Sequence, residues 1–278
     1  MYRLGFTEST LLFYYFLDNY CDNVNKKLYE KQQYKLFIWL YSTSGFYDKT
    51  INMDTAGAND ILKSAVYNNY FNLILKAIKN YKKETQLNFH KMNDELINKY
   101  MNLFFTFINK KNDKIIVDNN YVFNSIKNKN ITIINNLGSL MKKQYNNGNL
   151  KRIYGDFPVI KKIDFINVGY TFFNNGPYKS ILESVKNMHI QVDEKVLNTD
   201  LFIISSGAYS VLLAKYITQK YNKDVLVIGG SLATIFGVKT LRGIRHDKII
   251  KEKVGYFIDV PNSMKPKNYN DIEKGCYW

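Results

Sequence analysis

The sequence predicts an α/β protein whose mainly parallel sheet is flanked by helices, with a helical insertion in the N-terminal half. Short runs rich in β-branched residues alternate with helical patterns from residue 113 onward, and such alternation favours a parallel sheet. Two of these runs, 201–205 and 225–228, enclose one helical segment and form a βαβ unit. Two long helical patterns come before them, at about 57–83 and 92–110.

The chain of 278 residues is long enough for one large domain or two small ones. It contains four prolines, and neither an internal repeat nor a linker rich in Gly, Ser or Pro interrupts it. We therefore expect a single domain over residues 1–278. Its helical insertion covers about 55–112 and its βαβ half about 113–278.

The first segment, "YRLGFTESTLLFYYFLDNY", is typical of a short strand, a glycine turn and a helix. Thr7 or Ser9 is placed to cap this helix, and Glu8 in its first turn suits the helix dipole. One helical face collects the apolar residues Leu11, Leu12, Tyr15, Phe16 and Tyr20. An apolar run, "YKLFIWLYSTSGFYDKT", follows and ends in a polar turn.

The predicted strands of the second half are "KIIVD", "ITIIN", "IKKIDFINV", "DLFIIS" and "DVLVIG". The last four alternate with three helical segments, "GSLMKKQY", "YKSILESVKNM" and "YSVLLAKYITQKY". These strands and helices make up the predicted sheet and its flanking layers.

The net charge of +15 favours an anionic partner. The lysines are scattered along the chain rather than gathered in one stripe, and no helix-turn-helix, zinc-finger or RNA-binding signature accompanies them. Nucleic acid is therefore not the favoured partner. An anionic small ligand, or an acceptor at an anionic membrane surface with peripheral membrane contact, uses the same positive field.

The compartment expected from the sequence is the cytoplasm. No apolar run approaches the roughly 18 to 20 residues that span a bilayer, and the N-terminus lacks the shape of a signal peptide. Cys21 and Cys276 lie at opposite ends of the chain without a zinc-type spacing. Two thiols in a reducing compartment are favoured over a single disulfide.

Small or polar residues follow every predicted strand, at the edge where open α/β sheets bind their ligands. Such residues let a ligand phosphate approach backbone N–H groups at a helix N-terminus. They also serve turns that need a positive φ or a cap, and neither "SSGAY" nor "GGS" is a full G-x-G-x-x-G or P-loop. Two such turns leave a phosphate-bearing ligand and a purely structural role as even alternatives. The residues concerned are 5–8, 135–139, 169–177, 205–208 and 229–231.

Charged and aromatic side chains near these turns supply further candidates. Glu8 is the acid best placed to hold a sugar hydroxyl, help bind a metal or act as a base, and the alternative is an exposed helix-dipole residue. Arg3 and Arg242 match the geometry of a diphosphate, and the alternative for each is a solvated charge. The cluster around Gly45 and Phe46 offers flat faces to a sugar or base, although such residues more often form core.

Six stretches, in order along nearly the whole chain, resemble the GT-D-type glycosyltransferases, and most closely a group encoded with polysaccharide-biosynthesis genes. "YRLGFTES" resembles the family's R-x-G-x-x-E turn, and "STSGFY" is similar to its Ala-Gly-Phe-Phe element. "NKNITIINNLGSLMKKQY" resembles a strand-loop-helix that ends in Gln-Tyr, and "DLFIISSGAYSVLLAKYI" resembles the Gly-Ala-Tyr-Gly segment. "DVLVIGGSLATIFGVKTLRG" and "IEKGCYW" are similar to the Gly-Gly run and the Cys-Tyr-Trp ending.

The resemblance implies a Rossmann-like, nucleotide-binding fold and a glycosyltransferase that moves a sugar from a nucleotide-diphosphate donor, of UDP type, to a glycan or lipid-linked acceptor. Glu8 would be the catalytic residue, and the metal implied is Mn²⁺ or Mg²⁺. The donor contacts would be Arg3, Gly5, Thr7, Ser139, Ser205, Ser206, Gly207, Ala208, Tyr209, Gly229, Gly230, Ser231 and Arg242. The acceptor or sugar contacts would be Gly45, Phe46 and Asn175.

The chain departs from the family pattern at three positions. Phe6 stands where the Asp-x-Glu motif has its aspartate, Ser210 where the family has glycine, and Gly243 where it has tryptophan. A single carboxylate is a poor site for Mg²⁺ or Mn²⁺, so we expect the diphosphate to be held largely without a cation. A relative that binds a nucleotide or glycan without turnover, or a basic nucleic-acid-binding protein, are the alternatives.

Overall fold

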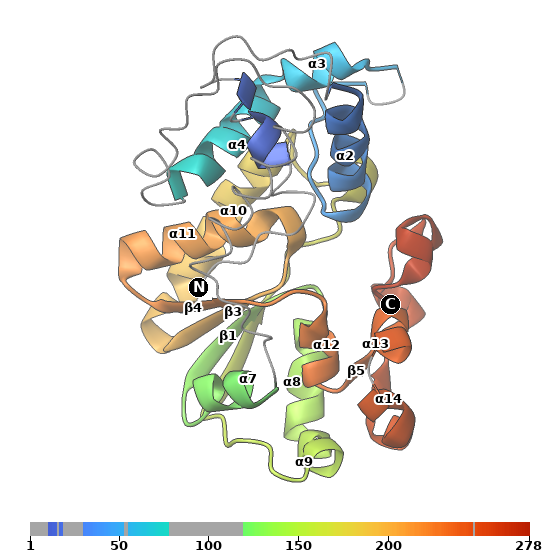
Figure 1. Cartoon of the computed structure of the whole chain (residues 1–278). Coiled ribbons are helices and arrows are strands. Elements are labelled where there is room, and N and C mark those ends of the chain that lie inside the picture. Colours follow the sequence, from blue (N-terminus) through green and yellow to red (C-terminus); the bar gives the residue numbers. More distant parts are fainter. Residues whose placement is uncertain (1–10, 16, 19–29, 53–54, 78–118, 247) are drawn as a thin grey trace. The chain divides into compact units, whose positions relative to one another are not determined.

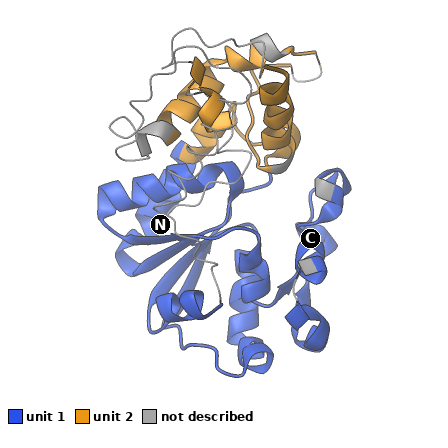
Figure 2. Ribbon diagram, in the orientation of Figure 1, with its two compact units in different colours: residues 1, 115–170, 186–278 blue, residues 2–114, 171–185 orange. Residues whose placement is uncertain are grey.

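A computed structural model of the chain describes residues 11–15, 17–18, 30–52, 55–77, 119–246 and 248–278 (Figure 1). The chain divides into two compact units (Figure 2). The sheet unit comprises residues 1, 115–170 and 186–278, and the helical unit comprises 2–114 and 171–185. The prediction of one continuous domain stays a prediction, and each unit is described by itself.

Four parallel strands form the main sheet of the sheet unit, in the order β2-β1-β3-β4 (Figure 1). They are β1 (Asn130–Ile134), β2 (Lys162–Ile166), β3 (Leu201–Ile204) and β4 (Asp224–Val227). The register places Ile131 beside Leu201 and Leu201 beside Asp224. The α/β class with a mainly parallel sheet is confirmed, and all four predicted runs between 130 and 229 form strands.

Burial explains why these runs become strands. Every residue of β3, and every residue of β1 after Asn130, is buried, as expected for the centre of a parallel sheet covered on both faces. The edge strand β2 instead carries Lys162 and Asp164, whose ion pair measures 3.0 Å. Charged residues on an edge strand discourage pairing with a further strand.

Helices flank the sheet on both sides. The helix α8 (Gly138–Asn146) packs on β2, and α11 (Ser210–Tyr221) packs on β4 (Figure 1). The helix α10 (Ile181–Lys195) runs beside α11, since the His189 ring stacks on the Tyr216 ring with centroids 3.6 Å apart. The helical patterns predicted at 138–145, 178–188 and 209–221 are therefore confirmed, α10 starting at Ile181.

The sheet unit contains shorter elements that complete the layers. A second, two-stranded parallel sheet joins β5 (Val238–Lys239) to β6 (Ile258–Asp259) and was not predicted. The remaining helices are α7 (Asn119–Ile126), α9 (Asn149–Tyr154), α12 (Ser231–Ile235), α13 (Leu241–His246) and α14 (Lys248–Glu252). The 3-10 turns are η3 (Val196–Asn198), η4 (Gly207–Tyr209), η5 (Val254–Tyr256), η6 (Asn262–Met264), η7 (Tyr269–Asp271) and η8 (Glu273–Gly275).

An aromatic core holds the helical unit together. The Phe46 ring packs edge-on against Phe37 and Tyr70, with centroids 5.3 and 5.2 Å apart. The elements are α2 (Glu30–Thr43), α3 (Ala58–Leu62), α4 (Ala65–Ala77), η2 (Phe172–Asn174) and helical residues at 11–15 and 17–18. The run "YKLFIWLYST" thus lies within α2.

Part of the sequence prediction lies outside the described residues. This holds for the short strand before Gly5, for "KIIVD", and for the helical pattern at 92–110 with the end of the pattern at 57–83. The start of the latter pattern forms α3 and α4. Among the described helices, none combines the length and the apolar character needed to cross a bilayer.

Candidate functional site

The strand order places the turns after β1 and β3 next to each other. From β1 the chain moves to β2 on one side and then returns to β3 on the other, so the direction of winding reverses between β1 and β3. Open α/β sheets bind ligands at such a switch point, beyond the carboxyl ends of the strands. The residues that follow β1 and β3 are therefore the strongest candidates for a ligand-binding site.

Hydrogen bonds join the turns after β1, β3 and β4 to one another. The Asn135 side-chain amide donates to the Ser205 carbonyl oxygen at 2.5 Å, and the Ser205 hydroxyl donates to the Gly229 carbonyl oxygen at 3.2 Å. Asn135 also accepts a bond from the Leu137 amide at 2.7 Å, which holds its own turn. Residues far apart in the sequence thus meet at one edge of the sheet.

The turn after β2 joins the same series through Asn136. The Asn136 side-chain oxygen accepts bonds from the Val168 and Gly169 amides, at 3.0 and 2.8 Å. Its amide group donates to the Gly169 carbonyl oxygen at 3.0 Å. All four strand-end turns of the main sheet are therefore linked, from Gly169 through Asn136, Asn135 and Ser205 to Gly229. We call this series the linked turns.

The backbone conformation and the hydrogen bonds of the turn at 205–210 limit the groups that it can offer to a ligand. Gly207 has a φ of 53°, in the left-handed region that favours glycine, and it is exposed. The Ser206 amide donates to the Ser210 hydroxyl oxygen at 3.1 Å, so this N–H is already engaged. Ser210 stands where the GT-D-type family has glycine, and its hydroxyl therefore occupies the Ser206 amide.

Ala208 and Tyr209 point into the protein. Their exposed fractions are 2 % and 1 %, so neither offers its side chain to a ligand in this structure. The donor contact predicted for Tyr209 therefore does not come from its side chain in this structure. Ser139, near the start of α8, is half-buried, and Ser205 and Ser206 are half-buried at the edge itself.

The turn at 229–231 is more open. Gly229 and Ser231 are exposed, and a Cβ atom added to Gly229 would meet no atom within 4 Å. A Cβ atom on Gly230 would instead lie 3.2 Å from the Arg242 Cδ atom, so the Arg242 side chain passes over Gly230. This arrangement brings an exposed guanidinium to a glycine turn, as a phosphate group would require.

The C-terminal segment fixes the position of Arg242. The Arg242 amide donates to the Cys276 carbonyl oxygen at 2.8 Å, and the Leu241 amide donates to the Trp278 carbonyl oxygen at 3.2 Å. The Trp278 indole N–H donates to the Tyr170 hydroxyl oxygen at 2.9 Å, beyond the end of β2. The "CYW" ending therefore ties the helix of Arg242 to the last residues after β2.

Contacts in the sheet unit explain two further residues of the stretches that resemble the GT-D-type family. A Cβ atom on Gly243 would lie 2.6 Å from the Thr234 hydroxyl oxygen and 2.7 Å from Ile250 Cδ1, so no tryptophan fits there. The buried Gln144 amide donates to the carbonyl oxygens of Gly237 and Tyr256, at 2.6 and 2.8 Å. Both residues hold the elements around α12 and α14 together.

The remaining predicted site residues fall outside the described part of the sheet unit. Arg3, Gly5, Thr7 and Glu8 lie outside the described residues, as does Phe6. Gly45, Phe46 and Asn175 belong to the helical unit. Phe46 is fully buried in its aromatic core, so its ring leaves no face open to a sugar. Gly45 accepts a bond from the Thr171 hydroxyl at 2.6 Å, which fixes the loop before α3 to the segment after β2.

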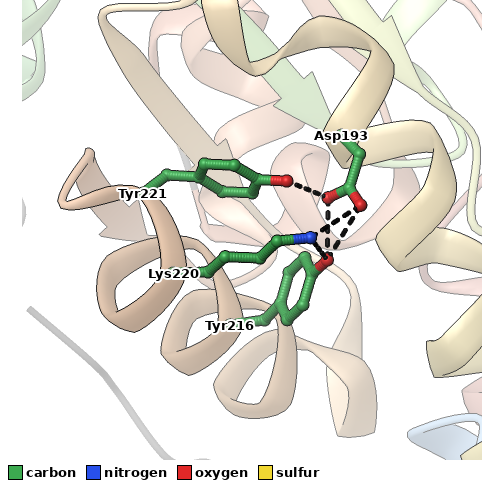
Figure 3. Close-up of polar contacts among 4 residues, drawn as sticks. All are labelled: Asp193, Tyr216, Lys220 and Tyr221. Carbon is green, nitrogen blue, oxygen red and sulfur yellow. Dashed lines mark hydrogen bonds and ion pairs between the residues drawn. The ribbon is translucent and has the colours of Figure 1, made fainter.

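A polar cluster that sequence reasoning missed joins α10 to α11 (Figure 3). The Asp193 carboxylate accepts bonds from the hydroxyls of Tyr221, at 2.6 Å, and Tyr216, at 2.8 Å, and from the Lys220 ammonium at 2.9 Å. Burial alone would raise the pKa of Asp193, but the bonds from Tyr221, Lys220 and Tyr216 outweigh it and lower the pKa to about 2. The bond with Tyr216, together with those to Tyr221 and Asp193, raises the pKa of Lys220.

These shifts have a structural cause. Perturbed pKa values often mark functional sites, but ion-pair networks between helices produce them too. Every polar group of the cluster has a partner within it, and the cluster lies on the helices rather than at the ends of the strands. We therefore interpret it as a clamp between α10 and α11.

Within the described residues, no three His, Cys, Asp or Glu side chains come together in a way that could hold a metal ion. The carboxylate for which a metal was considered, Glu8, lies outside them. In comparisons with known proteins, no family model, no curated protein and no solved structure matches this chain.

Proposed function

We propose that the linked turns bind the diphosphate of a nucleotide-diphosphate sugar, and that the protein is a glycosyltransferase that moves the sugar to a glycan acceptor. The observation that carries the proposal is the hydrogen-bonded series from Gly169 to Gly229 at the carboxyl edge of the sheet. Ligands of open α/β sheets bind at this edge. The resemblance to GT-D-type enzymes favours a nucleotide-sugar, of UDP type, among the phosphate ligands that fit.

Within this edge we assign the diphosphate to the Gly229–Gly230 turn and Arg242. The backbone is most accessible there, because a Cβ atom on Gly229 would meet no neighbour, and the Arg242 side chain passes over the same turn. The Ser206 amide is less suitable because it already donates to Ser210. The net charge of +15 supports attraction of an anionic donor over longer distances.

Sugar transfer requires two contributions from the protein. It must stabilise the departing diphosphate, which backbone N–H groups and a guanidinium do through charge-assisted hydrogen bonds. It must also accept a proton from the attacking hydroxyl, the role we assign to Glu8. Phe6 removes one ligand of a metal at this turn, so a lone Glu8 does not fit a Mg²⁺ or Mn²⁺ site and no step is assigned to a metal.

A thermal-shift screen against UDP-, GDP- and dTDP-sugars, with and without Mn²⁺, tests the binding step. We expect one of the UDP-sugars to raise the melting temperature, and Arg242→Gln to weaken its binding about tenfold or more, because a charge-assisted bond is lost. Arg245→Gln is the matched control, since Arg245 is exposed on the same helix α13 one turn further on. Equal losses in both variants would assign the effect to net charge and reject the site.

Turnover separates the enzyme from a relative that only binds. The donor that binds best is incubated with wild type and with Glu8→Gln, and release of the nucleotide diphosphate is followed. We expect release by the wild type and its loss in Glu8→Gln, while Glu30→Gln, in the first turn of α2, keeps it. Binding without release would favour the non-catalytic relative, to which the Phe6 substitution already points. Tight, salt-dependent DNA binding without any response to nucleotides would favour the nucleic-acid alternative.

A further inference from the structure

One surface of the sheet unit joins exposed apolar side chains to exposed basic ones. The turn η5 presents Val254 and Tyr256, whose exposed fractions are 54 % and 39 %, with the exposed Gly255 between them. It lies against α9 and α14. Five exposed basic residues lie on these two helices and the adjoining chain: Lys151, Arg152, Lys248, Lys251 and Lys253. We call these residues, with Val254 to Tyr256, the η5 patch.

The charge of this patch is strongly positive. Segments 149–156 and 248–256 carry these five basic residues against two acidic ones, Asp156 and Glu252, which leaves a net charge of +3. The ion pairs among the described residues involve other lysines, so none of the five is neutralised by a carboxylate there. Uncompensated charge beside exposed apolar groups distinguishes this surface from an ordinary solvated one.

The patch is also held in place. The buried side chains Ile250 and Phe257 anchor the chain on either side of η5. The Tyr256 carbonyl oxygen accepts a bond from the buried Gln144 at 2.8 Å, and the Arg152 guanidinium lies 5.9 Å from the centre of the Tyr256 ring. Val254 is therefore presented to solvent by a fixed backbone rather than by a loose loop.

We propose that the η5 patch docks the protein on an anionic lipid bilayer, with Val254 and Tyr256 at the depth of the headgroups and the five basic side chains on the lipid phosphates. Aromatic and aliphatic side chains favour the interface between headgroup and acyl chain, and basic residues within a Debye length of an anionic surface add to binding. An acidic protein partner would need directed carboxylate contacts, for which a surface with exposed apolar side chains among its basic ones is less suited. The inference does not depend on the proposed transferase activity.

Vesicle co-sedimentation tests the proposal. The full-length protein is mixed with vesicles of phosphatidylcholine alone or with one third phosphatidylglycerol, at low and at physiological salt. We expect binding only to the anionic vesicles, weakened by salt. The double variant Lys251→Gln/Lys253→Gln should lower the partition coefficient about 25-fold, at about fivefold for each lysine. Val254→Ser should lower it about tenfold through the lost apolar contact.

Matched controls separate the patch from general properties of the chain. Lys127→Gln/Lys186→Gln removes the same charge from two other exposed lysines, and Leu197→Ser removes a side chain that is 88 % exposed on η3. Both should bind anionic vesicles as wild type does. Unchanged melting temperatures of all variants show that the fold is intact.

Four outcomes would overturn the proposal. The first is an absence of binding to anionic vesicles at low salt, and the second is an equal loss in the Lys127→Gln/Lys186→Gln control. The third is full vesicle binding by Val254→Ser together with loss of single-stranded DNA binding in Lys251→Gln/Lys253→Gln, which would assign the surface to nucleic acid. A concentration-dependent dimer that Val254→Ser disrupts, with no vesicle binding, would assign it to a second copy of the chain.

Discussion

Replacing Gly229 by alanine gives the sharpest test of where a ligand approaches the linked turns. A Cβ atom at this position would meet no protein atom within 4 Å, and its backbone does not lie in the left-handed region. The folded protein therefore has room for the methyl group. Because alanine restricts the unfolded chain more than glycine does, we expect Gly229→Ala to be about 0.4 to 1 kcal/mol more stable than wild type.

The same methyl group occupies the space through which a diphosphate would approach the backbone. Forcing a ligand past one extra methyl group costs about 1 to 3 kcal/mol in a close-fitting site, which corresponds to a loss of affinity of roughly 5- to 150-fold. Isothermal titration calorimetry with the nucleotide-sugar selected by the screen measures this loss. Thermal unfolding without ligand measures the gain in stability.

Gly255→Ala is the matched control for this prediction. Gly255 is also exposed, and a Cβ atom there would likewise meet nothing within 4 Å, but it lies on η5 rather than at a strand end. Its variant should bind the nucleotide-sugar as wild type does. If Gly229→Ala binds the ligand with unchanged affinity, the diphosphate does not contact this turn and our assignment is wrong.

The remaining predictions concern stability and are measured by chemical or thermal unfolding. Gly243→Ala should destabilise the protein by about 1 to 3 kcal/mol, because its Cβ atom would lie 2.6 Å from a Thr234 oxygen. Gln144→Leu should cost roughly 2 kcal/mol, because the Tyr256 carbonyl oxygen loses its side-chain donor and the Gly237 carbonyl oxygen keeps only the Ile258 amide, whereas Gln219→Leu, at an exposed position of α11, should cost little. Asp193→Asn should cost about 0.5 to 1 kcal/mol at pH 7, a range reduced because the Asp193 side chain is 37 % exposed. The pKa of Asp193 is lowered to about 2 on folding, so its contribution is complete above about pH 4 and disappears as the pH falls toward 2. A difference between wild type and Asp193→Asn that stays constant from pH 7 to pH 2 would contradict the clamp.

The strands of the main sheet could be predicted because their burial is simple. The runs at 131–134 and 201–204 are β-branched or apolar at nearly every position, and both become central strands buried on both faces. The run "YKLFIWLYST" could not be assigned, since a short apolar stretch fits a buried helix as well as a strand. Its structure as α2 depends on the aromatic partners Phe46 and Tyr67, which come later in the chain.

The candidate site could be predicted only in part. The small residues at 205–207 and 229–230 are visible in the sequence, and the strand order places their turns side by side. The roles of Asn135 and Asn136 depend on that order, because Asn135 reaches Ser205 only when β3 lies directly beside β1. Likewise, Asp193 meets Tyr216 and Tyr221 only once α10 packs on α11. Contacts of this kind follow from tertiary packing, which no local pattern contains.

The linked turns also alter the electrostatic character of the edge they form. The carboxyl end of a parallel strand exposes backbone carbonyl oxygens, whose partial negative charge repels an anion. Here the side chains of Asn135, Asn136 and Ser205 donate to three of these oxygens, on Ser205, Gly169 and Gly229. Each bond offsets a negative pole at the place where a phosphate would arrive. The same asparagines accept from the Leu137, Val168 and Gly169 amides, so the bonds pair backbone poles of both signs along this edge. The unpaired positive charge for an anionic ligand would then have to come from the Arg242 side chain over Gly230.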